Sequence, residues 1–362
     1  MTLREWPRGT DPAVPGVRVV TAGPRMRLYV AGRRRIVPPV VFGVGVLWHL
    51  LRHGRRYDVV HTASFPYFSL LAAGAARRRG RFRLLVDWHE IWTIAYWREY
   101  LGRAPGRIGW LVQRLCVVVP QEAFCFARLT ERRLRDEGFR GAVTVLEGEY
   151  AGSLEPAEPR PSEPVVVFAG RHIPEKRVPA LVSALAVARR ELPHLRAEIY
   201  GDGPDRPEVL RRIASAGLEG DVSAPGFVDA DVVEQALERA QCMVLPSRRE
   251  GYGLIVVEAS ARGVPSVVVG GPDNAATELV EEGENGVIAA SASAEDLAAA
   301  IVAVDAAGHD LRVRTAAWFA ANARRLSLAS SLDTVLERYQ GSEATPALAR
   351  SRRARRGPPP PS

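Results

Sequence analysis

Hydrophobic and polar positions alternate most regularly in the second half of the chain. From residue 165 onward, apolar runs of strand length alternate with amphipathic segments of helix length. Strands are predicted at 165–169, 196–200 and 266–269 and near Val222 and Met243, and helices at 179–191, 208–216, 231–240 and 254–262. Strands that alternate with helices indicate a parallel sheet with helical crossovers. Residues 295–304 and 310–339 are then predicted to be helical, the second segment as a long amphipathic run.

The first half of the chain has a less even pattern. Strands are predicted at 17–21, 57–61 and 82–86, with a strand and loop at 143–150 and a helix that ends at Arg79. A long amphipathic region rich in Trp and Arg covers residues 91–125. Residues 36–51 are nearly all apolar and allow two interpretations, a core helix entered through two prolines or an interfacial membrane helix. No stretch reaches the roughly 18 uninterrupted apolar residues of a membrane span.

A segment rich in Pro and Glu, residues 151–164, lacks a packing face and is predicted to be a linker. It divides the chain into two predicted domains. The predicted divisions are a first domain at 1–150, the linker at 151–164, a second domain at 165–312, a helix that crosses back to the first domain at 313–340, and a disordered basic, Pro-rich tail at 341–362.

Charge is unevenly spread along these domains. The chain of 362 residues has a net charge of +8, but residues 1–150 hold 25 Arg and only 12 acidic residues. Such a basic half suggests an anionic partner, for example a membrane surface or a phosphorylated acceptor. The alternative is a solvated face in an Arg-biased chain. No RNA-recognition or zinc-finger pattern is present, so nucleic acid is not expected as a partner.

The three cysteines form no CxxC pair, which argues against a disulfide framework or a zinc site. The N-terminal residues lack the apolar core of a signal peptide. We therefore expect a cytoplasmic protein, and the basic first half adds the hypothesis of peripheral contact with the inner membrane face.

The candidate chemistry centres on residues 247–265, which follow a short apolar strand. Gly251 and Gly253 allow a tight turn in which backbone N–H groups approach a ligand closely. Glu250 lies in this loop, and Glu258 lies about one turn into the helix that begins at Leu254. Ligands bind at such strand ends in α/β folds, and a helix N-terminus favours anions. The alternative is that both glutamates are ordinary solvated acids.

A second loop carries two cations. Of the 49 basic residues only one is Lys, and this residue, Lys176, lies with Arg171 on the loop that opens at Gly170 after the strand at 165–169. Two cations on such a loop can neutralise a diphosphate and stabilise it as a leaving group without a metal.

Five motifs in this half then occur in a recognisable order: G-R-x-x-P-E-K, Y-G-D-G-P, P-G-F-V, P-S-R-R-E-G-Y-G-L-x-x-x-E-A and G-x-N-G. In their order and spacing, over about residues 165–290, they resemble the second half of family 4 glycosyltransferases. That resemblance implies the GT-B fold, in which two Rossmann-like domains face each other across a cleft. It also implies a retaining, metal-independent enzyme that uses a nucleotide-diphosphate sugar as donor and needs no cofactor.

The resemblance also implies roles for individual residues. Arg171 and Lys176 would bind the donor diphosphate, with Gly170 opening their loop. Glu250 and the loop around it would hold the donor sugar, and Glu258 would bond the ribose hydroxyls. The implied donor-binding set is completed by Gly226, Phe227 and Val228 at the base and by Gly251, Tyr252, Gly253 and Leu254 around the sugar and helix start.

The match is thinner in the first half. Asp87-Trp-His-Glu resembles the strand end where the family has a histidine near the transferred sugar, which makes His89 the candidate to bond a sugar hydroxyl or accept the acceptor's proton. A structural histidine remains the alternative, and His61 is a weaker candidate for lining the cleft. The implied catalytic set is His89, Glu250, Arg171 and Lys176, with Glu250 as a sugar-binding group rather than a nucleophile.

One departure from the family pattern affects the first domain. Family members open with a strand, a Gly-rich loop and a helix, and nothing before Val17 has this pattern. We therefore expect either that the sequence as written starts downstream of the true start or that the protein lacks part of its acceptor domain.

Two other patterns have plainer interpretations. Asp229-Ala-Asp231 matches the metal-binding DxD pattern of a different glycosyltransferase fold, but it is better explained as helix N-capping. Gly201-Asp-Gly203 lacks the third glycine of a dinucleotide fingerprint.

The sequence thus predicts sugar transfer from a nucleotide-diphosphate sugar to a glycan, lipid-linked or cell-envelope acceptor. Two alternatives stay open. The first is a nucleotide-sugar binder without turnover, because of the missing strand, and the second is a nucleotide-sugar epimerase.

Overall fold

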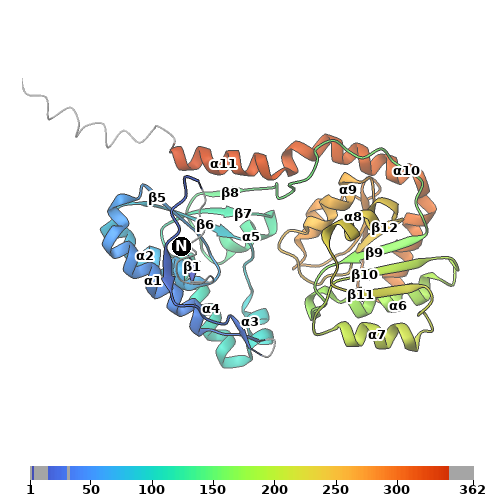
Figure 1. Ribbon diagram of the computed structural model, residues 1–362, viewed down its shortest axis with the longest axis horizontal. Coiled ribbons are helices and arrows are strands. Elements are labelled where there is room, and N and C mark those ends of the chain that lie inside the picture. Colours follow the sequence, from blue (N-terminus) through green and yellow to red (C-terminus); the bar gives the residue numbers. More distant parts are fainter. Residues whose placement is uncertain (1, 4–14, 31–32, 342–362) are drawn as a thin grey trace, which may run out of the picture.

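The computed structural model describes residues 2–3, 15–30 and 33–341. Within this part the chain forms two lobes, each built on a parallel sheet flanked by helices (Figure 1). The predicted α/β class with parallel sheets is confirmed. Residues 342–362 of the predicted disordered tail lie outside the described residues.

The first lobe contains a four-stranded parallel sheet in the order β5-β6-β7-β8. Its strands are Val59–Ala63, Arg83–Trp88, Glu122–Cys125 and Val143–Val145. Its helices are α1 (Val37–His53), α2 (Tyr67–Gly80), α3 (Ile94–Leu101), α4 (Arg103–Val117) and α5 (Arg128–Asp136), and a 3₁₀ turn covers Gly54–Arg56. Two small sheets precede α1, formed by β1 (Thr2–Leu3) with β2 (Thr21–Gly23) and by β3 (Tyr29–Val30) with β4 (Arg33–Arg34).

Both faces of this sheet are covered, as the buried residues of β6 show. Successive strand residues point to opposite sides of the sheet, so they enter two different cores. Leu84 and Val86 join the larger core beneath α2 and α4. Leu85 points the other way and packs with Phe124 in a smaller cluster that Val335 of α11 (Leu328–Gln340) reaches. The C-terminal helix is therefore part of the packing of the first lobe.

The second lobe contains a six-stranded parallel sheet in the order β11-β10-β9-β12-β13-β14. Its strands are β9 (Val165–Ala169), β10 (Arg196–Tyr200), β11 (Val222–Gly226), β12 (Cys242–Leu245), β13 (Ser266–Val269) and β14 (Gly286–Ala289). Its helices are α6 (Val178–Ala188), α7 (Arg206–Ser215), α8 (Ala230–Arg239), α9 (Leu254–Ala261) and α10 (Ala294–Leu326), and 3₁₀ turns cover Pro174–Lys176 and Ala275–Leu279. The strand order proceeds outward in both directions from the β9–β12 pair, which makes this pair the switch point where open α/β sheets bind ligands.

Two connections join the lobes. The segment 151–164 has no helix or strand and leads from β8 to β9. Helix α10 is interrupted at Gly308, whose φ of 56° is non-helical, and after Ser327 the chain continues as α11 across to the first lobe (Figure 1). There Arg83 donates to the carbonyl of Arg338 at 2.7 Å, and Tyr339 bonds His61 at 2.5 Å.

Several predicted boundaries are wrong. The strand placed at 17–21 begins only at Thr21, and the amphipathic region 91–125 ends in the strand Glu122–Cys125. Strand β14 was not predicted because the glycine that opens it belongs to the G-x-N-G motif, which is typical of a turn. These segments are short, and sheet pairing rather than local pattern decides their structure.

Candidate functional site

The loops that follow β9 and β12 lie side by side at the switch point of the second sheet. The first continues from Gly170 through the 3₁₀ turn to Lys176, and the second runs from Ser247 to Gly253 before α9 begins. The two loops are joined by the backbone, since Arg248 N donates to the carbonyl of Glu175 at 2.8 Å. Both predicted donor-binding loops therefore form one surface.

Lys176 and Glu250 meet at the centre of this surface. The ammonium group of Lys176 donates to Glu250 Oε1, and only 18% and 10% of the two side chains are exposed. The backbone of Glu250 is fixed from behind by hydrogen bonds to Asp273 and Ala275 at 3.1 Å each. Arg171, on the same loop as Lys176, is exposed and has no ion-pair partner among the described residues. The ion pair thus holds the Glu250 carboxylate in a fixed position next to Lys176. Arg171 is a second cation on the same loop as Lys176.

Glu258 lies one turn into α9, away from this pair. Burial raises the pKa of Glu258, and Glu234 adds to that effect while Arg262 opposes it. Arg262 bonds Glu234 at 3.0 Å and donates to the backbone carbonyl of Glu258 at 3.0 Å. A half-buried carboxylate whose charge is only partly compensated is suited to accept hydrogen bonds from hydroxyl groups.

The segment predicted to line a base pocket follows β11. Gly226 has a φ of 101°, which only glycine adopts readily, and the ring of Phe227 is 84% exposed. Val228 packs partly against the core. An aromatic ring held in solvent beside a turn is available to stack on a planar ligand.

Glycines shape the loop after β12. A Cβ on Gly253, whose φ is 105°, would lie 2.6 Å from the Cβ of Ala276. A Cβ on Gly251 would lie 3.0 Å from the carbonyl oxygen of His89 and from Cγ of Glu90, in the other lobe. Between them, Tyr252 donates its hydroxyl to the carbonyl of Glu147 at 2.6 Å, also across the lobes. Gly253 therefore has no space for a side chain within its own lobe, Gly251 packs tightly against the first lobe, and Leu254 then starts α9.

His89 follows β6 and faces this loop through its backbone. Its ring is stacked on Phe126, with centroids 4.3 Å apart, and its other side is exposed. Partial burial lowers the pKa of His89, although Asp87 and Glu90 act in the opposite direction. The imidazole is therefore neutral at pH 7 and can accept a proton or a hydrogen bond.

His61 does not line the same surface. Its Nε2 bonds Asp87 at 2.7 Å and its Nδ1 bonds Tyr339, so this histidine lies beneath α11. The expectation that it lines the cleft is wrong, because His61 lies in the middle of β5 and both of its ring nitrogens are bonded, to Asp87 and to Tyr339 of the C-terminal helix.

The structure also places the two motifs that were not expected to bind a ligand, Asp229-Ala-Asp231 and Gly201-Asp-Gly203. Asp229 occupies the N-cap position of α8, but its side chain accepts no capping hydrogen bond. Gly201 and Gly203 have φ values of 115° and 156°, and a Cβ on either would meet a backbone oxygen of the Gly170 loop at 1.9 or 2.3 Å. Their role is to let the loop after β10 pack against the cation-bearing loop.

The sequence analysis missed a set of side chains that join the lobes beside Glu250. Arg249 extends into the first lobe, where its Nε donates to Glu90 at 2.9 Å and its guanidinium lies 4.2 Å from the ring centroid of Tyr96. Tyr96 in turn donates to Glu175 at 2.6 Å, and Arg248 pairs with Glu99 at 2.7 Å. The only sequence signal was the run of Trp and Tyr after residue 90, which is equally typical of a core.

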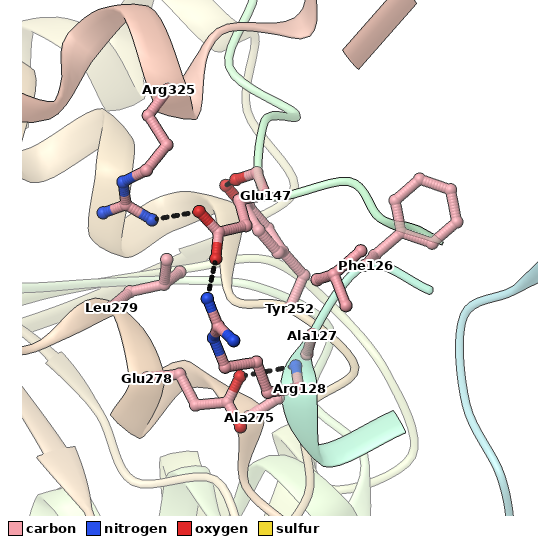
Figure 2. Close-up of a pocket in the computed structure, with 10 residues that line it drawn as sticks. Phe126, Ala127, Arg128, Glu147, Tyr252, Ala275, Glu278, Leu279 and Arg325 are labelled. Carbon is pink, nitrogen blue, oxygen red and sulfur yellow. Dashed lines mark hydrogen bonds and ion pairs between the residues drawn. The ribbon is translucent and has the colours of Figure 1, made fainter. Parts of the chain in front are cut away.

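A second group of contacts encloses a cavity of about 280 Å³ between the lobes (Figure 2). Glu147 lies at its centre and bonds Arg128 at 3.0 Å and Arg325 at 2.8 Å. Below it, Glu278 accepts hydrogen bonds from the backbone N–H groups of Arg128 and Leu129, both at 2.8 Å. The first turn of α5 in one lobe is thereby capped by a carboxylate from the other.

Comparisons with known proteins show which family the chain resembles. A family model described as "Glycosyl transferases group 1" matches residues 163–305. The chain is 30% identical over 125 residues to the alpha-D-kanosaminyltransferase of Streptomyces kanamyceticus, which covers 34% of this chain and 32% of that protein. The chain thus spans about a third of that curated relative. It is 32% identical over 349 residues to the glycogen synthase of Mycobacterium tuberculosis, which covers 87% of this chain and 80% of that protein.

Solved structures share the architecture. Sucrose-phosphate synthase from Thermosynechococcus elongatus has a TM-score of 0.72 at 19% identity and covers 91% of this chain and 86% of its own. Anabaena Alr3699/HepE, solved in complex with UDP, has a TM-score of 0.67 at 20% identity and covers 82% of both chains. At these identities the likeness concerns the fold, and it confirms the predicted GT-B arrangement. By its similarity to relatives over most of its length, the chain belongs to the glycosyl transferases group 1 family.

Proposed function

We propose that this protein transfers a sugar from a nucleotide-diphosphate sugar to an acceptor hydroxyl, with retention of anomeric configuration and without a metal. The observation that carries the proposal is the contact between Lys176 and Glu250 at the switch point of the second sheet, with Arg171 exposed on the same loop as Lys176. Solved structures with the same fold include Anabaena Alr3699/HepE in complex with UDP and the pneumococcal GtfA in complex with UDP and GlcNAc, which supports a nucleotide-sugar donor. Placement in family 4 is part of the proposal, and the order and spacing of the five loop motifs support it.

In this reaction the bond between the anomeric carbon and the diphosphate oxygen breaks, and the acceptor oxygen forms the new bond on the same face. The diphosphate leaves with additional negative charge, which Arg171 and Lys176 stabilise by charge-assisted hydrogen bonds. Glu250 holds hydroxyls of the donor sugar, and its pairing with Lys176 keeps both groups oriented before the donor arrives.

The remaining roles follow the arrangement of the loops. Glu258 accepts hydrogen bonds from the ribose hydroxyls, and the base lies against residues 226–228. His89, neutral at pH 7, bonds a sugar hydroxyl or takes the acceptor's proton.

The acceptor is proposed to be a glycan or a lipid-linked molecule at the cell envelope, reached from the cytoplasmic side. Supporting this, α1 carries an exposed apolar stripe that runs from Val37 through Val40, Val44 and Trp48 to Leu51. In the described part of the chain no helix has both the length and the apolar character to cross a bilayer. The stripe is instead suited to lie along a membrane surface.

At one end of this stripe, exposed arginines supply positive charge, which an anionic membrane surface would attract. The C-terminal ends of α1 and α2 meet, since a Cβ on Gly54 would lie 3.2 Å from Cα of Gly80. Among the described residues, no ion pair involves the six exposed arginines at this end: Arg52, Arg55, Arg56, Arg78, Arg79 and Arg81. We define this stripe and these arginines together as the α1 surface, and its partner is proposed to be anionic phospholipid.

The proposal is tested by thermal stabilisation of the protein with a panel of nucleoside diphosphates. One base is expected to raise the melting temperature in the wild type. The Lys176→Ala variant is expected to lose at least tenfold in affinity, because a hydrogen bond to a charged group contributes roughly 1.5–3 kcal/mol. Arg190→Ala, which removes an exposed cation at the end of α6, is the matched control and should leave the shift unchanged.

Product analysis separates the alternatives. Nucleoside diphosphate released only when an acceptor is present indicates transfer, and a new nucleotide sugar formed without an acceptor would indicate an epimerase. Normal donor affinity with no product across a panel of lipid and glycan acceptors would indicate a binder without turnover. A folded wild type that no nucleoside diphosphate stabilises contradicts the donor site itself.

A further inference from the structure

Arg249 is a residue of the second lobe whose side chain is buried in the first lobe. It directly precedes Glu250 and follows β12, yet its guanidinium lies among Glu90, Trp92 and Tyr96. Only 5% of its side chain is exposed. A charged group this deeply buried needs an organised set of partners, since burying an unpaired charge is costly.

The first lobe provides that set. Glu90 accepts the Nε hydrogen bond at 2.9 Å and is itself held by Trp92, whose Nε1 donates to the same carboxylate oxygen at 2.8 Å. The planar guanidinium lies 4.2 Å from the ring centroid of Tyr96 and 5.2 Å from that of Trp92. Stacking of this kind is specific to Arg, because Lys carries a compact ammonium with no planar face.

The contact continues directly into the candidate donor site. Tyr96, which stacks on Arg249, also donates to Glu175, the neighbour of Lys176. On the other side, Gly251 lies against the backbone of His89 and against Glu90, where an added Cβ would be 3.0 Å from each. The loop that bears Glu250 is therefore held between Arg249 and Gly251, both of which touch the same segment of the first lobe.

The contact between Arg249 and the first lobe leaves one hydrogen-bond donor of the guanidinium unsatisfied. Nη1 of Arg249 is buried without a hydrogen-bond partner. A buried donor that lacks an acceptor offsets part of the gain from the other contacts. A contact that leaves one donor unsatisfied is easier to break than a fully satisfied one, which suits an interface that opens to admit the donor and closes again for transfer.

We propose that Arg249 is a positioning residue that couples the Glu250 loop to closure of the two lobes. When the lobes close, insertion of its guanidinium between Glu90 and the two aromatic rings sets the loop in the geometry required for sugar transfer. Its effect is on the position of Glu250 and on the distance between the lobes, and it does not itself touch the donor. The inference on catalysis depends on the proposed function, whereas the inference on closure does not.

The experiment measures lobe separation and catalysis in parallel. Nitroxide labels at Arg107→Cys and Glu219→Cys, exposed positions in the two lobes, report the distance between them by electron-spin resonance. The native cysteines are all buried, and burial raises the thiol pKa of each to about 12, so they do not compete for the label. Kinetics with saturating acceptor give kcat and the KM for the donor.

Arg249→Ala is expected to shift the distance distribution toward longer values and to lower kcat at least tenfold. Nucleoside diphosphates should still stabilise this variant, because the cations of the second lobe remain. Arg249→Lys should fail to restore either property, since the ammonium cannot stack. Glu90→Ala removes the partner from the opposite lobe and should open the lobes in the same way, so the test remains valid if Arg249→Ala does not fold.

Arg196→Ala is the matched control. This arginine pairs with Glu163 at the surface of the second lobe, and its loss should change kcat by less than twofold. Unchanged distances in both Arg249→Ala and Glu90→Ala, or full rescue by Arg249→Lys, would overturn the proposal. If no nucleotide binds the wild type, the donor site is wrong, and the distance measurements still decide whether Arg249 holds the lobes together.

Discussion

Glu258 shows how a single residue at this site can lower the stability of the folded protein and still be suited to bind a ligand. Its carboxylate is half-buried in α9, where burial raises its pKa and Arg262 compensates only in part. A residue that disfavours its own ionised form in the folded protein lowers stability at neutral pH. Such a residue fits a ligand-binding role better than a role in packing.

We predict that Glu258→Gln raises the melting temperature at pH 7–8 and weakens stabilisation by nucleoside diphosphates. The folded-state pKa of Glu258 lies above the unfolded value of 4.5, so the ionised form costs stability at every pH above the folded pKa. The cost disappears as pH falls below 4.5, and the two proteins should then differ less. Melting curves from pH 4 to 8, with and without nucleotide, provide the measurement.

Glu234→Gln is a suitable control, because this carboxylate is exposed and forms an ion pair with Arg262. It should leave nucleotide stabilisation intact. If Glu258→Gln is less stable than the wild type at pH 8, the carboxylate contributes to folding and its assigned role in binding loses its support.

At the scale of elements, helix α5 depends on the other lobe for its N-terminus. No side chain of its own caps it, and Glu278 from the 3₁₀ turn Ala275–Leu279 bonds the N–H groups of Arg128 and Leu129 instead. A carboxylate at this end also interacts favourably with the helix dipole. Closure of the lobes and order in the first turn of α5 are therefore linked.

We predict that Glu278→Ala accelerates hydrogen exchange at the amides of Arg128 and Leu129 by roughly fivefold or more. This follows from the ~1 kcal/mol that a helix N-cap typically contributes. Hydrogen exchange followed by mass spectrometry or NMR provides the measurement. Glu284→Ala removes a nearby exposed acid and should leave these amides unchanged. Equal protection in the two variants would mean that the cap contributes nothing in solution.

At the scale of the whole molecule, the chain crosses between its lobes twice. Helix α11 returns to cover the first sheet through Val335 and Tyr339, while the α1 surface lies in the same lobe and remains uncovered in the described structure. Its largest apolar side chain, Trp48, is 64% exposed and stacks with Arg52 at 5.2 Å. An exposed apolar stripe that ends in unpaired arginines is consistent with binding at an anionic membrane.

We predict that the protein co-sediments with vesicles containing phosphatidylglycerol and not with vesicles of phosphatidylcholine alone. Binding should weaken as salt is raised, because screening shortens the reach of the arginine charges. The double variant Val44→Glu, Trp48→Glu should lose at least tenfold in vesicle affinity. Leu210→Glu, a comparable change at an exposed leucine of α7, should bind like the wild type. If the double variant binds vesicles as well as the wild type does, the α1 surface does not contact the membrane.

The fold class was largely determined by the sequence. Apolar runs of four or five residues that alternate with helical segments leave few arrangements besides parallel sheets, and the second lobe has these strands and helices close to the predicted bounds. The order of the loop motifs likewise located Lys176, Glu250 and Glu258 at strand ends or helix starts, because local pattern determines where each element begins.

Tertiary structure alone decided which of these residues meet. Lys176 and Glu250 are separated by 74 positions, and only the adjacency of β9 and β12 brings them into contact. The insertion of Arg249 among Glu90, Trp92 and Tyr96, and the capping of α5 by Glu278, depend on how two separately folded lobes face each other. The period of the hydrophobic positions indicates which face of a segment packs on its own sheet. It does not indicate which polar side chains of one lobe meet those of the other.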